Sequence, residues 1–373
     1  MYLSNLKLNN FKTYTECDVD FCPNVNCLVG NNGVGKTNLL DAIYYLSFCK
    51  SYFNSIDTMN IRVGEEYFAI HGRYLGLDDT GEERLVSCVQ KRGHPKMMKY
   101  EKKAYKSFSD HIGKIPLVIV SPTDQGMILG GSDVRRKFMD GVISQTDKDY
   151  LRHLLQYTKA VEQRNHLLKQ MNEAREWDEE AIEMWDMQLV QHGKKLFEAR
   201  VSFLEKFEPL FLKYYGDIAT GKETPSLIYN SQMIGETPFE EQLRNARAAD
   251  RVVQYTTIGP HKDDLHFKIE NMAIKKFGSQ GQQKTFSLAL KLAQFQYIND
   301  ALGVKPILLL DDIFDKLDLP RITQLIQLVG SERFGQVFIT DTQPGRVEQI
   351  FREIPTMEHK LFTVEDGQIK EKE

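Results

Sequence analysis

The sequence lacks the features that would place it in a membrane or in an oxidising compartment. No apolar run approaches the roughly 18 residues of a membrane-spanning helix, and the first residues, MYLSNLKLNNFK, lack the apolar core of a signal peptide. The cysteines are an odd number and form no CxxC pair, so we expect five reduced thiols: Cys17, Cys22, Cys27, Cys49 and Cys88. These absences predict a cytoplasmic protein.

A surplus of charge is also missing. The chain has 48 Lys and Arg against 52 Asp and Glu, a formal net charge of −4, so the whole molecule lacks the positive field that is typical of nucleic-acid binders. Any contact with DNA must therefore come from a local patch. The best candidate is residues 91–106, which carry seven Lys or Arg and one Glu, although such a run is more often a solvated hairpin.

What the sequence does have is a glycine-rich loop, VGNNGVGKTN, at residues 29–38. It fits the pattern G-x-x-x-x-G-K-[ST] and lies between an apolar strand-like segment and a segment with helical spacing, which is the context of a P-loop. The expected nucleotide contacts are Gly30, Asn31, Asn32, Gly33, Val34, Gly35, Lys36, Thr37 and Asn38. Lys36 would reach the β- and γ-phosphates, and the Thr37 hydroxyl would bind Mg²⁺.

A second apolar segment ends in two carboxylates. In KPILLLDDIFDKLD, residues 305–318, four apolar residues precede Asp311 and Asp312, as expected for a buried strand that leads into an ATP site. Asp311 would join Thr37 at the metal, and Asp312 would orient or deprotonate the attacking water. We take Lys36, Asp311 and Asp312 as the candidate catalytic residues.

Between these segments lies SQGQQKTFSLALKLAQFQ, residues 279–296, in which small and amide residues begin a helix. A helix N-terminus is an anion site, yet the chain already has a phosphate-binding loop. We therefore expect Ser279, Gly281 and Gln282 to contact the γ-phosphate of ATP held by a second subunit, in a head-to-head dimer.

The length and the residue pattern indicate about two domains. From about residue 133 to 215 glycine is rare and apolar residues recur with a helical period. We expect an ATPase head in residues 1–132 and 251–373, with a helical arm or lid inserted at residues 133–250. The 275 positions between Lys36 and Asp311 are too many for a compact transport ATPase subunit, whereas the arm is too short for the long coiled coils of SMC proteins.

Eight segments along nearly the whole chain form a recognisable set: LNNFKTY (8–14), GNNGVGKTN (30–38), SPTD (121–124), RRKFMD (135–140), QRNHLLK (163–169), TTIGPHKDDL (256–265), SQGQQK (279–284) and LLLDDIFDKLD (308–318). In these segments the sequence resembles the RecF family of bacterial recombination mediators. The departures are Thr123 for a glutamate, Lys262 for an arginine, and Asp315 with Lys316 for a Ser-Glu pair. The last pair lies where the loop should cross the dimer interface.

The resemblance implies an α/β fold with an ABC/SMC-like ATPase head, a mixed sheet with flanking helices and an inserted helical arm. It also implies an ATP- and Mg²⁺-dependent DNA-binding dimer with weak, DNA-stimulated ATP hydrolysis that drives release of the dimer and DNA. Such proteins mark gapped DNA and junctions of single- and double-stranded DNA. With RecR and RecO they help to load RecA in recombinational repair, replication restart and the SOS response to DNA damage.

Two other functions fit parts of the sequence. A metal nuclease on the same head would use the segment HKDDLH, with His261, Asp263, Asp264 and His266, but strand alternation would place these ligands on two opposite faces. A small-molecule phosphotransferase would use the helical arm as a lid, and it would leave the Ser-Gly-Gln helix start without a role. Two sets of residues are candidates for DNA contact: Lys91, Arg92, Lys96, Lys99, Lys102 and Lys103, or Arg135, Arg136 and Arg164.

Overall fold

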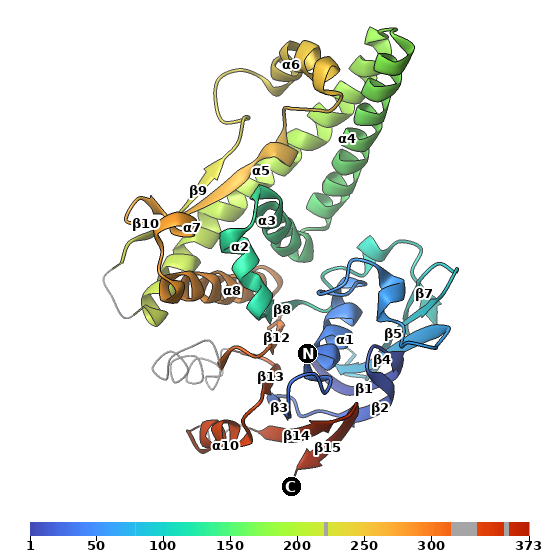
Figure 1. The fold of residues 1–373 in the computed structure, drawn as a ribbon, viewed down its shortest axis with the longest axis vertical. Helices are drawn as coiled ribbons and strands as arrows, with labels where there is room; N and C mark the ends of the chain where they lie inside the picture. The colour runs from blue at the N-terminus through green and yellow to red at the C-terminus, as the bar shows by residue number, and fades with distance from the viewer. Residues whose placement is uncertain (79, 220–222, 315–333, 354–357, 373) are drawn as a thin grey trace. The chain divides into compact units, whose positions relative to one another are not determined.

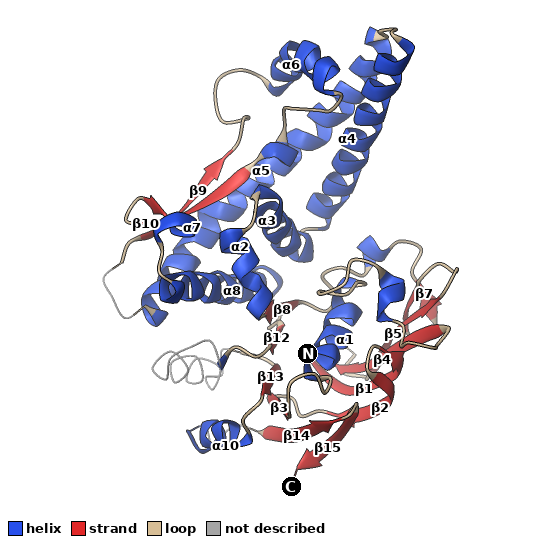
Figure 2. Ribbon diagram, in the orientation of Figure 1, coloured by secondary structure: helices blue, strands red, loops and turns tan. Residues whose placement is uncertain are grey.

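The computed structural model describes residues 1–78, 80–219, 223–314, 334–353 and 358–372. The chain divides into two compact units, and each is described by itself. The head unit comprises Met1–Asp124 and Leu288–Glu373, and the arm unit comprises Gln125–Ser287. Strands dominate the first and helices the second (Figure 2).

The boundaries of these units differ from those expected from the sequence. Residues 251–287, which we assigned to the head, belong to the arm unit. The reason is strand pairing, since β10 (Asp264–Ile269) pairs antiparallel with β9 (Pro225–Asn230). Composition changes mark the start of a helical insertion, whereas a return through a small sheet leaves no comparable signal.

The head unit contains an antiparallel sheet in the order β2-β1-β4-β5-β6-β7. Its strands are β1 (Tyr2–Phe11), β2 (Tyr14–Asp20), β4 (Tyr67–Leu75), β5 (Arg84–Lys91), β6 (Met97–Tyr100) and β7 (Lys103–Ala104). Leu6 and Leu8 of β1 are fully buried and Lys7 between them is exposed, which is the alternation of a strand with one covered face.

The second sheet of the head unit has the order β15-β14-β3-β13-β12-β8. Its strands are β3 (Val25–Val29), β8 (Leu117–Val120), β12 (Ile307–Leu310), β13 (Val337–Asp341), β14 (His359–Glu365) and β15 (Gln368–Lys372). All pairings are parallel except that between β14 and β15. The strands β3, β8, β12 and β13 are buried at every position, as expected for parallel strands covered on both faces.

Helix α1 (Lys36–Phe48) joins the two sheets into one core (Figure 1). Ten of its residues are buried, and Leu39, Ile43 and Leu46 belong to the same apolar cluster as residues of β1, β4, β8 and β12. The helix begins directly after the glycine-rich loop, so burial of the helix also fixes the position of that loop.

The arm unit is built around two long helices, α4 and α5, which pack along each other (Figure 1). Its helices are α2 (Gln125–Leu129), α3 (Ser132–Thr146), α4 (Lys148–Ala174), α5 (Glu179–Ile218), α6 (Phe239–Val253) and α7 (Ile274–Phe277). Asp147 and Asp178 cap α4 and α5 through their side chains. A three-stranded sheet contains β9, β10 and β11 (Met272–Ala273).

Two further helices, α8 and α10, lie among the described residues. Helix α8 (Gln280–Leu302) begins in the arm unit, and its residues from Leu288 belong to the head unit. Helix α10 (Pro344–Glu353) follows β13. Among the described residues, no helix has the length and apolar character needed to cross a bilayer.

Candidate nucleotide-binding site

The candidate site lies where the central parallel strands end. Val29 at the end of β3 pairs with Asp341 of β13, and Leu310 at the end of β12 pairs with Ile339 of β13. Because parallel strands end at the same edge of a sheet, the glycine-rich loop after Val29 and the acidic residues after Leu310 lie at one edge. This topology brings together two segments that are about 275 positions apart in the sequence.

The glycine-rich loop needs glycine at two positions for different reasons. Gly35 has φ of +116°, a conformation that L residues rarely adopt. A Cβ on Gly30 would lie 2.4 Å from the carbonyl oxygen of Val364, so only glycine fits there. The Lys36 ammonium donates hydrogen bonds to the carbonyl oxygens of Gly30 and Asn31, at 2.7 and 2.8 Å, which places its charge inside the loop.

The other loop residues expected at the nucleotide differ in exposure. Asn31, Asn32 and Gly33 are exposed, while Val34, Thr37 and Asn38 are half-buried. The Asn38 side-chain amide donates a hydrogen bond to the Thr13 hydroxyl at 3.0 Å. The exposed tip of the loop, followed by a buried helix start, is the arrangement that an anion-binding P-loop requires.

The Asp311 carboxylate connects the acidic strand end to the P-loop. Its Oδ1 accepts hydrogen bonds from the Thr37 hydroxyl at 2.9 Å and from the Thr340 hydroxyl at 3.0 Å. The side chain is buried, and burial raises the pKa of Asp311 while the two hydroxyl donors oppose that shift. The predicted pair of metal ligands is thus in direct contact.

Asp312 adopts a left-handed conformation with φ of +48°, which is uncommon for a residue other than glycine. Its backbone N–H donates to the Thr340 hydroxyl oxygen at 2.9 Å. Thr340 therefore contacts both members of the acidic pair and fixes the backbone from which the Asp312 side chain projects.

Thr37 and Asp311 fit a magnesium ion in their chemistry. A hydroxyl and a carboxylate are hard oxygen donors, and Mg²⁺ characteristically takes one or two such protein ligands together with phosphate oxygens and water. The described residues contain no cluster of three or more His, Cys, Asp or Glu side chains that could hold a metal by themselves. A site completed by the nucleotide agrees with both observations.

Three contacts around the P-loop were not predicted from the sequence. The Tyr14 hydroxyl donates to the Gly35 carbonyl oxygen at 3.0 Å, Thr13 accepts from Asn38, and Thr340 bridges the acidic pair. The segment LNNFKTY was identified only as part of the family resemblance, and it places Thr13 and Tyr14 against the loop. Thr340 had no signal in the sequence, because its role depends on the neighbouring strand.

The SPTD segment forms a turn after β8. Asp124 accepts from the backbone N–H of Ser121 at 2.7 Å and from the Tyr52 hydroxyl at 2.6 Å, and it forms a buried ion pair with Lys291 at 2.9 Å. Thr123, one of the departures from the family pattern, donates its N–H to the Ser121 hydroxyl at 3.4 Å. Asp124 therefore ties this loop to helix α8.

The predicted second anion site begins helix α8. The Ser279 hydroxyl accepts from the Gln282 N–H at 3.2 Å, and the Gln282 side-chain oxygen accepts from the Ser279 N–H at 2.7 Å. This reciprocal pair is a capping box. Ser279 is exposed and Gly281 is half-buried, and a hydroxyl that accepts one hydrogen bond still has a proton to donate.

The HKDDLH segment differs from the alternating strand that we expected. His261 lies in a 3-10 turn, Pro260–Lys262, and β10 begins only at Asp264. Asp263 pairs with buried Arg200 at 2.8 Å, whereas Asp264 forms two hydrogen bonds with Arg135 at 2.7 and 2.9 Å. Both carboxylates therefore have arginine partners within the arm unit, which gives them a structural role.

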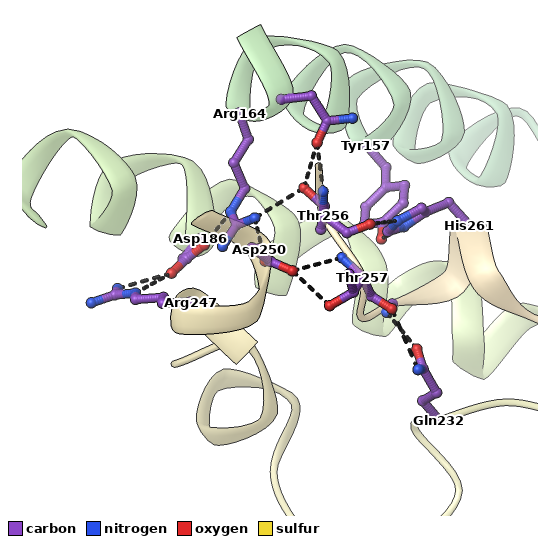
Figure 3. Close-up of polar contacts among 11 residues, drawn as sticks. Tyr157, Arg164, Asp186, Gln232, Arg247, Asp250, Thr256, Thr257 and His261 are labelled. Carbon is purple, nitrogen blue, oxygen red and sulfur yellow. Dashed lines mark hydrogen bonds and ion pairs between the residues drawn. The ribbon is translucent and has the colours of Figure 1, made fainter. Parts of the chain in front are cut away.

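The arginines proposed as one set of DNA contacts are used inside the arm unit. Arg164 is fully buried and pairs with Asp186 at 2.7 Å and Asp250 at 2.6 Å (Figure 3). Arg136 donates to the Asp263 carbonyl oxygen at 2.6 Å, and Arg135 pairs with Asp264. These side chains join α3, α4, α5 and α6 to the segment around β10, so this candidate set does not form an exposed patch.

The basic segment of the head unit is mostly exposed, with two exceptions, Lys96 and Lys99. Lys96 is 11% exposed and pairs with Asp57 at 2.7 Å, so it belongs to the structure of the sheet. Lys99 is half-buried. The exposed members are Lys91, Arg92, Lys102, Lys103 and Lys106. They lie on or beside β5 and β7, and they remain the candidate patch for a polyanion.

Comparison with known proteins agrees with this geometry. A family described as AAA ATPase domain matches residues 1–120. The DNA replication and repair protein RecF of Flavobacterium johnsoniae is 49% identical over 352 residues, which cover 94% of this chain and 97% of that protein. The RecF of Phocaeicola vulgatus is 46% identical over 373 residues, which cover 100% of this chain and 99% of that protein. This chain belongs to the RecF family.

Solved structures support the same assignment of the fold. A structure of the recombination mediator protein RecF with ATP, in the RecFOR pathway, has a TM-score of 0.90, 30% identity, and coverage of 100% of this chain and 98% of that one. An SMC head domain from Pyrococcus furiosus with an extended coiled coil has a TM-score of 0.58 and 17% identity, which indicates a shared fold. The predicted ABC/SMC-like head with an inserted helical arm is confirmed, and the predicted RecF resemblance is confirmed as well.

Proposed function

We propose that this RecF-family protein is an ATP-dependent DNA-binding ATPase whose two copies close head to head over two ATP molecules. The observation that carries the proposal is the 2.9 Å hydrogen bond between Thr37 and Asp311, because it joins the phosphate-binding loop to the acidic strand end in one polar centre. ATP binding by the solved RecF relative supports the nucleotide, and oxygen donors at this centre support Mg²⁺.

Each residue has a role that follows from its geometry. Lys36 and the loop amides would bind the β- and γ-phosphates, and Thr37 with Asp311 would hold Mg²⁺, which would neutralise negative charge on the phosphates. Asp312 would orient the attacking water. Its carboxylate is one methylene shorter than a glutamate would be, which favours slow hydrolysis because a general base must lie within about 3 Å of the proton it receives.

The capped start of α8 supplies the second half of the proposed site. Ser279, Gly281 and Gln282 would contact the γ-phosphate bound by the partner subunit, so that ATP joins the two copies and hydrolysis releases them. The exposed Ser279 at the N-terminus of a 23-residue helix supports this role. Asp315 and Lys316, where the sequence departs from the family at the expected interface, lie outside the described residues.

The DNA-related part of the proposal rests on the family. Gapped DNA or a junction of single- and double-stranded DNA would be the target, RecR and RecO the partners, and RecA loading the outcome, in recombinational repair and replication restart. The solved RecF relative is described as a protein of the RecFOR pathway, which supports these partners. The exposed basic residues of the head unit support contact with phosphates.

Sedimentation of the pure protein tests the dimer. We expect a monomer without nucleotide or with ADP. With a non-hydrolysable ATP analogue we expect a dimer, either with the analogue alone or when DNA is also present. A protein that stays monomeric when saturated with the analogue and DNA would contradict the proposal. Lys36→Arg should abolish or greatly slow ATP hydrolysis.

Asp312→Asn tests the second carboxylate. The amide keeps the size of the side chain and removes its negative charge, so we expect ATP to bind, hydrolysis to stop and the ATP-bound dimer to persist. Dimer lifetime is measured by dilution into excess ADP. Unchanged turnover and lifetime in this variant would remove Asp312 from the mechanism.

A further inference from the structure

The start of α8, where Ser279 would contact the γ-phosphate of the partner subunit, is connected to the C-terminal end of α5. The Gln282 side-chain amide donates to Glu223 Oε1 at 3.0 Å, and the Tyr215 hydroxyl donates to Glu223 Oε2. Tyr215 lies in the last turn of α5, and Gln282 lies in the first turn of α8. Glu223 therefore bridges the two helices through its two oxygens.

An aromatic cluster joins the same two helix ends. The ring of Phe286 lies 4.6 Å from that of Phe211 and 5.9 Å from that of Tyr215, measured between centroids. Phe267 of β10 also belongs to the cluster, with its ring centroid 5.1 Å from that of Phe286. Phe286 is fully buried, so the second turn of α8 packs directly on the end of α5. A displacement of one helix end must be accommodated by the other.

The bridge by Glu223 matters for the cap because Gln282 makes two hydrogen bonds with one amide. Its oxygen accepts from the Ser279 N–H, and its nitrogen is held by Glu223. An amide bonded at both ends has a fixed orientation, whereas an amide bonded only at its oxygen can leave the cap by rotating about its side-chain torsions. The first turn of a helix without its cap loses partners for its exposed N–H groups and frays.

We propose that Glu223 is a positioning residue for the Ser279 turn, and that through it the arm helix α5 controls closure of the two ATP sites. Glu223 does not touch the nucleotide. It holds Gln282, Gln282 holds the N-cap, and the cap presents the Ser279 hydroxyl to the γ-phosphate of the partner subunit. The inference rests on the proposed function, because it assigns a task to the dimer contact suggested above.

The test compares three variants of the full chain with the wild type. Glu223→Ala removes both oxygens of the bridge. Glu223→Gln keeps an oxygen for Gln282 and offers an N–H₂ group to the Tyr215 hydroxyl, so it should restore the bridge. Glu205→Ala removes an exposed carboxylate from α5 and controls for the change in charge.

The measured quantity is the dissociation constant of the dimer in a saturating non-hydrolysable ATP analogue. We expect Glu223→Ala to weaken the dimer about tenfold, as the loss of one to two hydrogen bonds implies. Glu223→Gln and Glu205→Ala should stay within about twofold of the wild type. Binding of a fluorescent ATP analogue to the monomer should be the same in all four proteins, because the P-loop belongs to the head unit.

Hydrogen exchange gives a readout that does not depend on the dimer. In the monomer, Glu223→Ala should speed exchange of the backbone amides in the first turn of α8 and leave those of α1 unchanged. Should Glu223→Ala fail to fold, Tyr215→Phe removes only the second hydrogen bond and should weaken the dimer about two- to threefold.

The outcomes separate the two proposals. A wild type that dimerises with the analogue, together with a Glu223→Ala variant that dimerises equally well, overturns the positioning role and leaves the proposed function intact. A Glu223→Gln variant as weak as Glu223→Ala also overturns it, because the hydrogen bonds would then be irrelevant. A wild type that remains monomeric overturns both.

Discussion

Thr340 is the residue on which the acidic pair depends most directly. Its hydroxyl donates to Asp311 at 3.0 Å and accepts from the Asp312 N–H at 2.9 Å. It lies in β13, next to β12, and is fully buried. One hydroxyl thus fixes both the proposed metal ligand and the left-handed backbone of Asp312.

Replacing Thr340 by valine should separate catalysis from binding. Valine has nearly the same shape and leaves the Asp312 N–H and one lone pair of Asp311 without this partner, at a cost of about 1–3 kcal/mol. We expect the rate constant for ATP hydrolysis to fall at least about tenfold, while the affinity for ATP changes less than about threefold, because Asp312 rather than the P-loop is misplaced. Single-turnover hydrolysis and equilibrium binding of a fluorescent analogue measure the two quantities.

Thr363→Val is the matched control for this variant. Thr363 lies in β14 of the same sheet and is half-buried, so it tests the general effect of losing a strand hydroxyl. An equal loss of hydrolysis in both variants would contradict the specific role of Thr340.

At the scale of single residues, local spacing predicted the P-loop and the acidic strand end. Thr37 and Asp311 were expected to share a ligand, and they lie within hydrogen-bonding distance. Thr340 was not predicted, because a threonine in an apolar strand gains its role only from the strand beside it. Strand alternation was expected to point the side chains of Asp263 and Asp264 in opposite directions. The two side chains do have different partners, Arg200 for Asp263 and Arg135 for Asp264, but they follow a turn at residues 260–262 rather than lying within an alternating strand.

At the scale of elements, helix α5 contains two glycines in opposite surroundings. A Cβ on Gly216 would meet no atom within 4 Å, whereas a Cβ on Gly193 would lie 2.8 Å from a ring carbon of Phe239 and 3.1 Å from one of Tyr157. Gly193 therefore allows α6 and α4 to approach α5 closely. The same substitution should have opposite effects at the two positions.

Gly216→Ala should raise the free energy of unfolding by about 0.5–1 kcal/mol, because alanine loses less backbone entropy in a helix. Gly193→Ala should lower it by about 1–3 kcal/mol, because the methyl group overpacks the contact between helices. Urea unfolding followed by circular dichroism measures both. If Gly193→Ala raised the free energy of unfolding instead, the Phe239 side chain would have to move away from the added methyl group without loss of stability.

Sequence periodicity predicted the elements better than their boundaries. The helical insertion expected from about residue 133 to 215 corresponds to α3, α4 and α5. The expected return to the head at residue 251 lies near the end of α6, which ends at Val253, and the next strand begins only at Asp264. Val252, Val253 and Tyr255, the apolar residues at this point of the chain, are exposed, so no buried face gives the segment a regular period.

At the scale of the whole molecule, each unit contains a histidine whose pKa is lowered to about 4: His111 is buried, and His261 is half-buried. Burial lowers the pKa of His111 in the head unit to about 4 and that of His261 in the arm unit to about 4. Each ring contacts a backbone carbonyl oxygen and a tyrosine hydroxyl: Leu46 and Tyr105 for His111, Thr256 and Tyr157 for His261. A ring that donates to the carbonyl through one nitrogen must accept from the hydroxyl through the other, and protonation removes that acceptor.

Both histidines should make the protein sensitive to acid. Their folded pKa lies below the ordinary value of about 6.5, so the stability they contribute is complete above pH 6.5 and is lost as the pH falls toward 4. Between pH 7.5 and 5 each should cost its unit about 2 kcal/mol of unfolding free energy. His111→Gln and His261→Gln should each reduce this dependence, as measured by urea unfolding at the two pH values.

His166→Gln is the control for the acid prediction. His166 is exposed on α4, so its loss should leave the pH dependence unchanged. The buried carboxyl of Asp263 has a raised pKa because of desolvation and acts in the opposite direction, since its protonation is easier in the folded state. Comparison of each variant with the wild type cancels that contribution. Equal pH dependence in all four proteins would show that neither histidine is neutral because of the fold.

Because the formal net charge of the chain is −4, any DNA contact must come from a local basic patch. The exposed lysines at β7 provide the sharpest test of such a patch. Each lysine that neutralises a phosphate releases counterions, which contributes roughly −0.9 to the slope of log affinity against log salt concentration. Lys102→Ala with Lys103→Ala should therefore reduce the magnitude of this slope by about 2 and weaken binding similarly for all DNA sequences. Lys370→Ala, at an exposed lysine of β15, should leave the slope unchanged. An unchanged slope in the double variant would move the DNA contact away from this segment, because phosphate contacts cannot be lost without a change in counterion release.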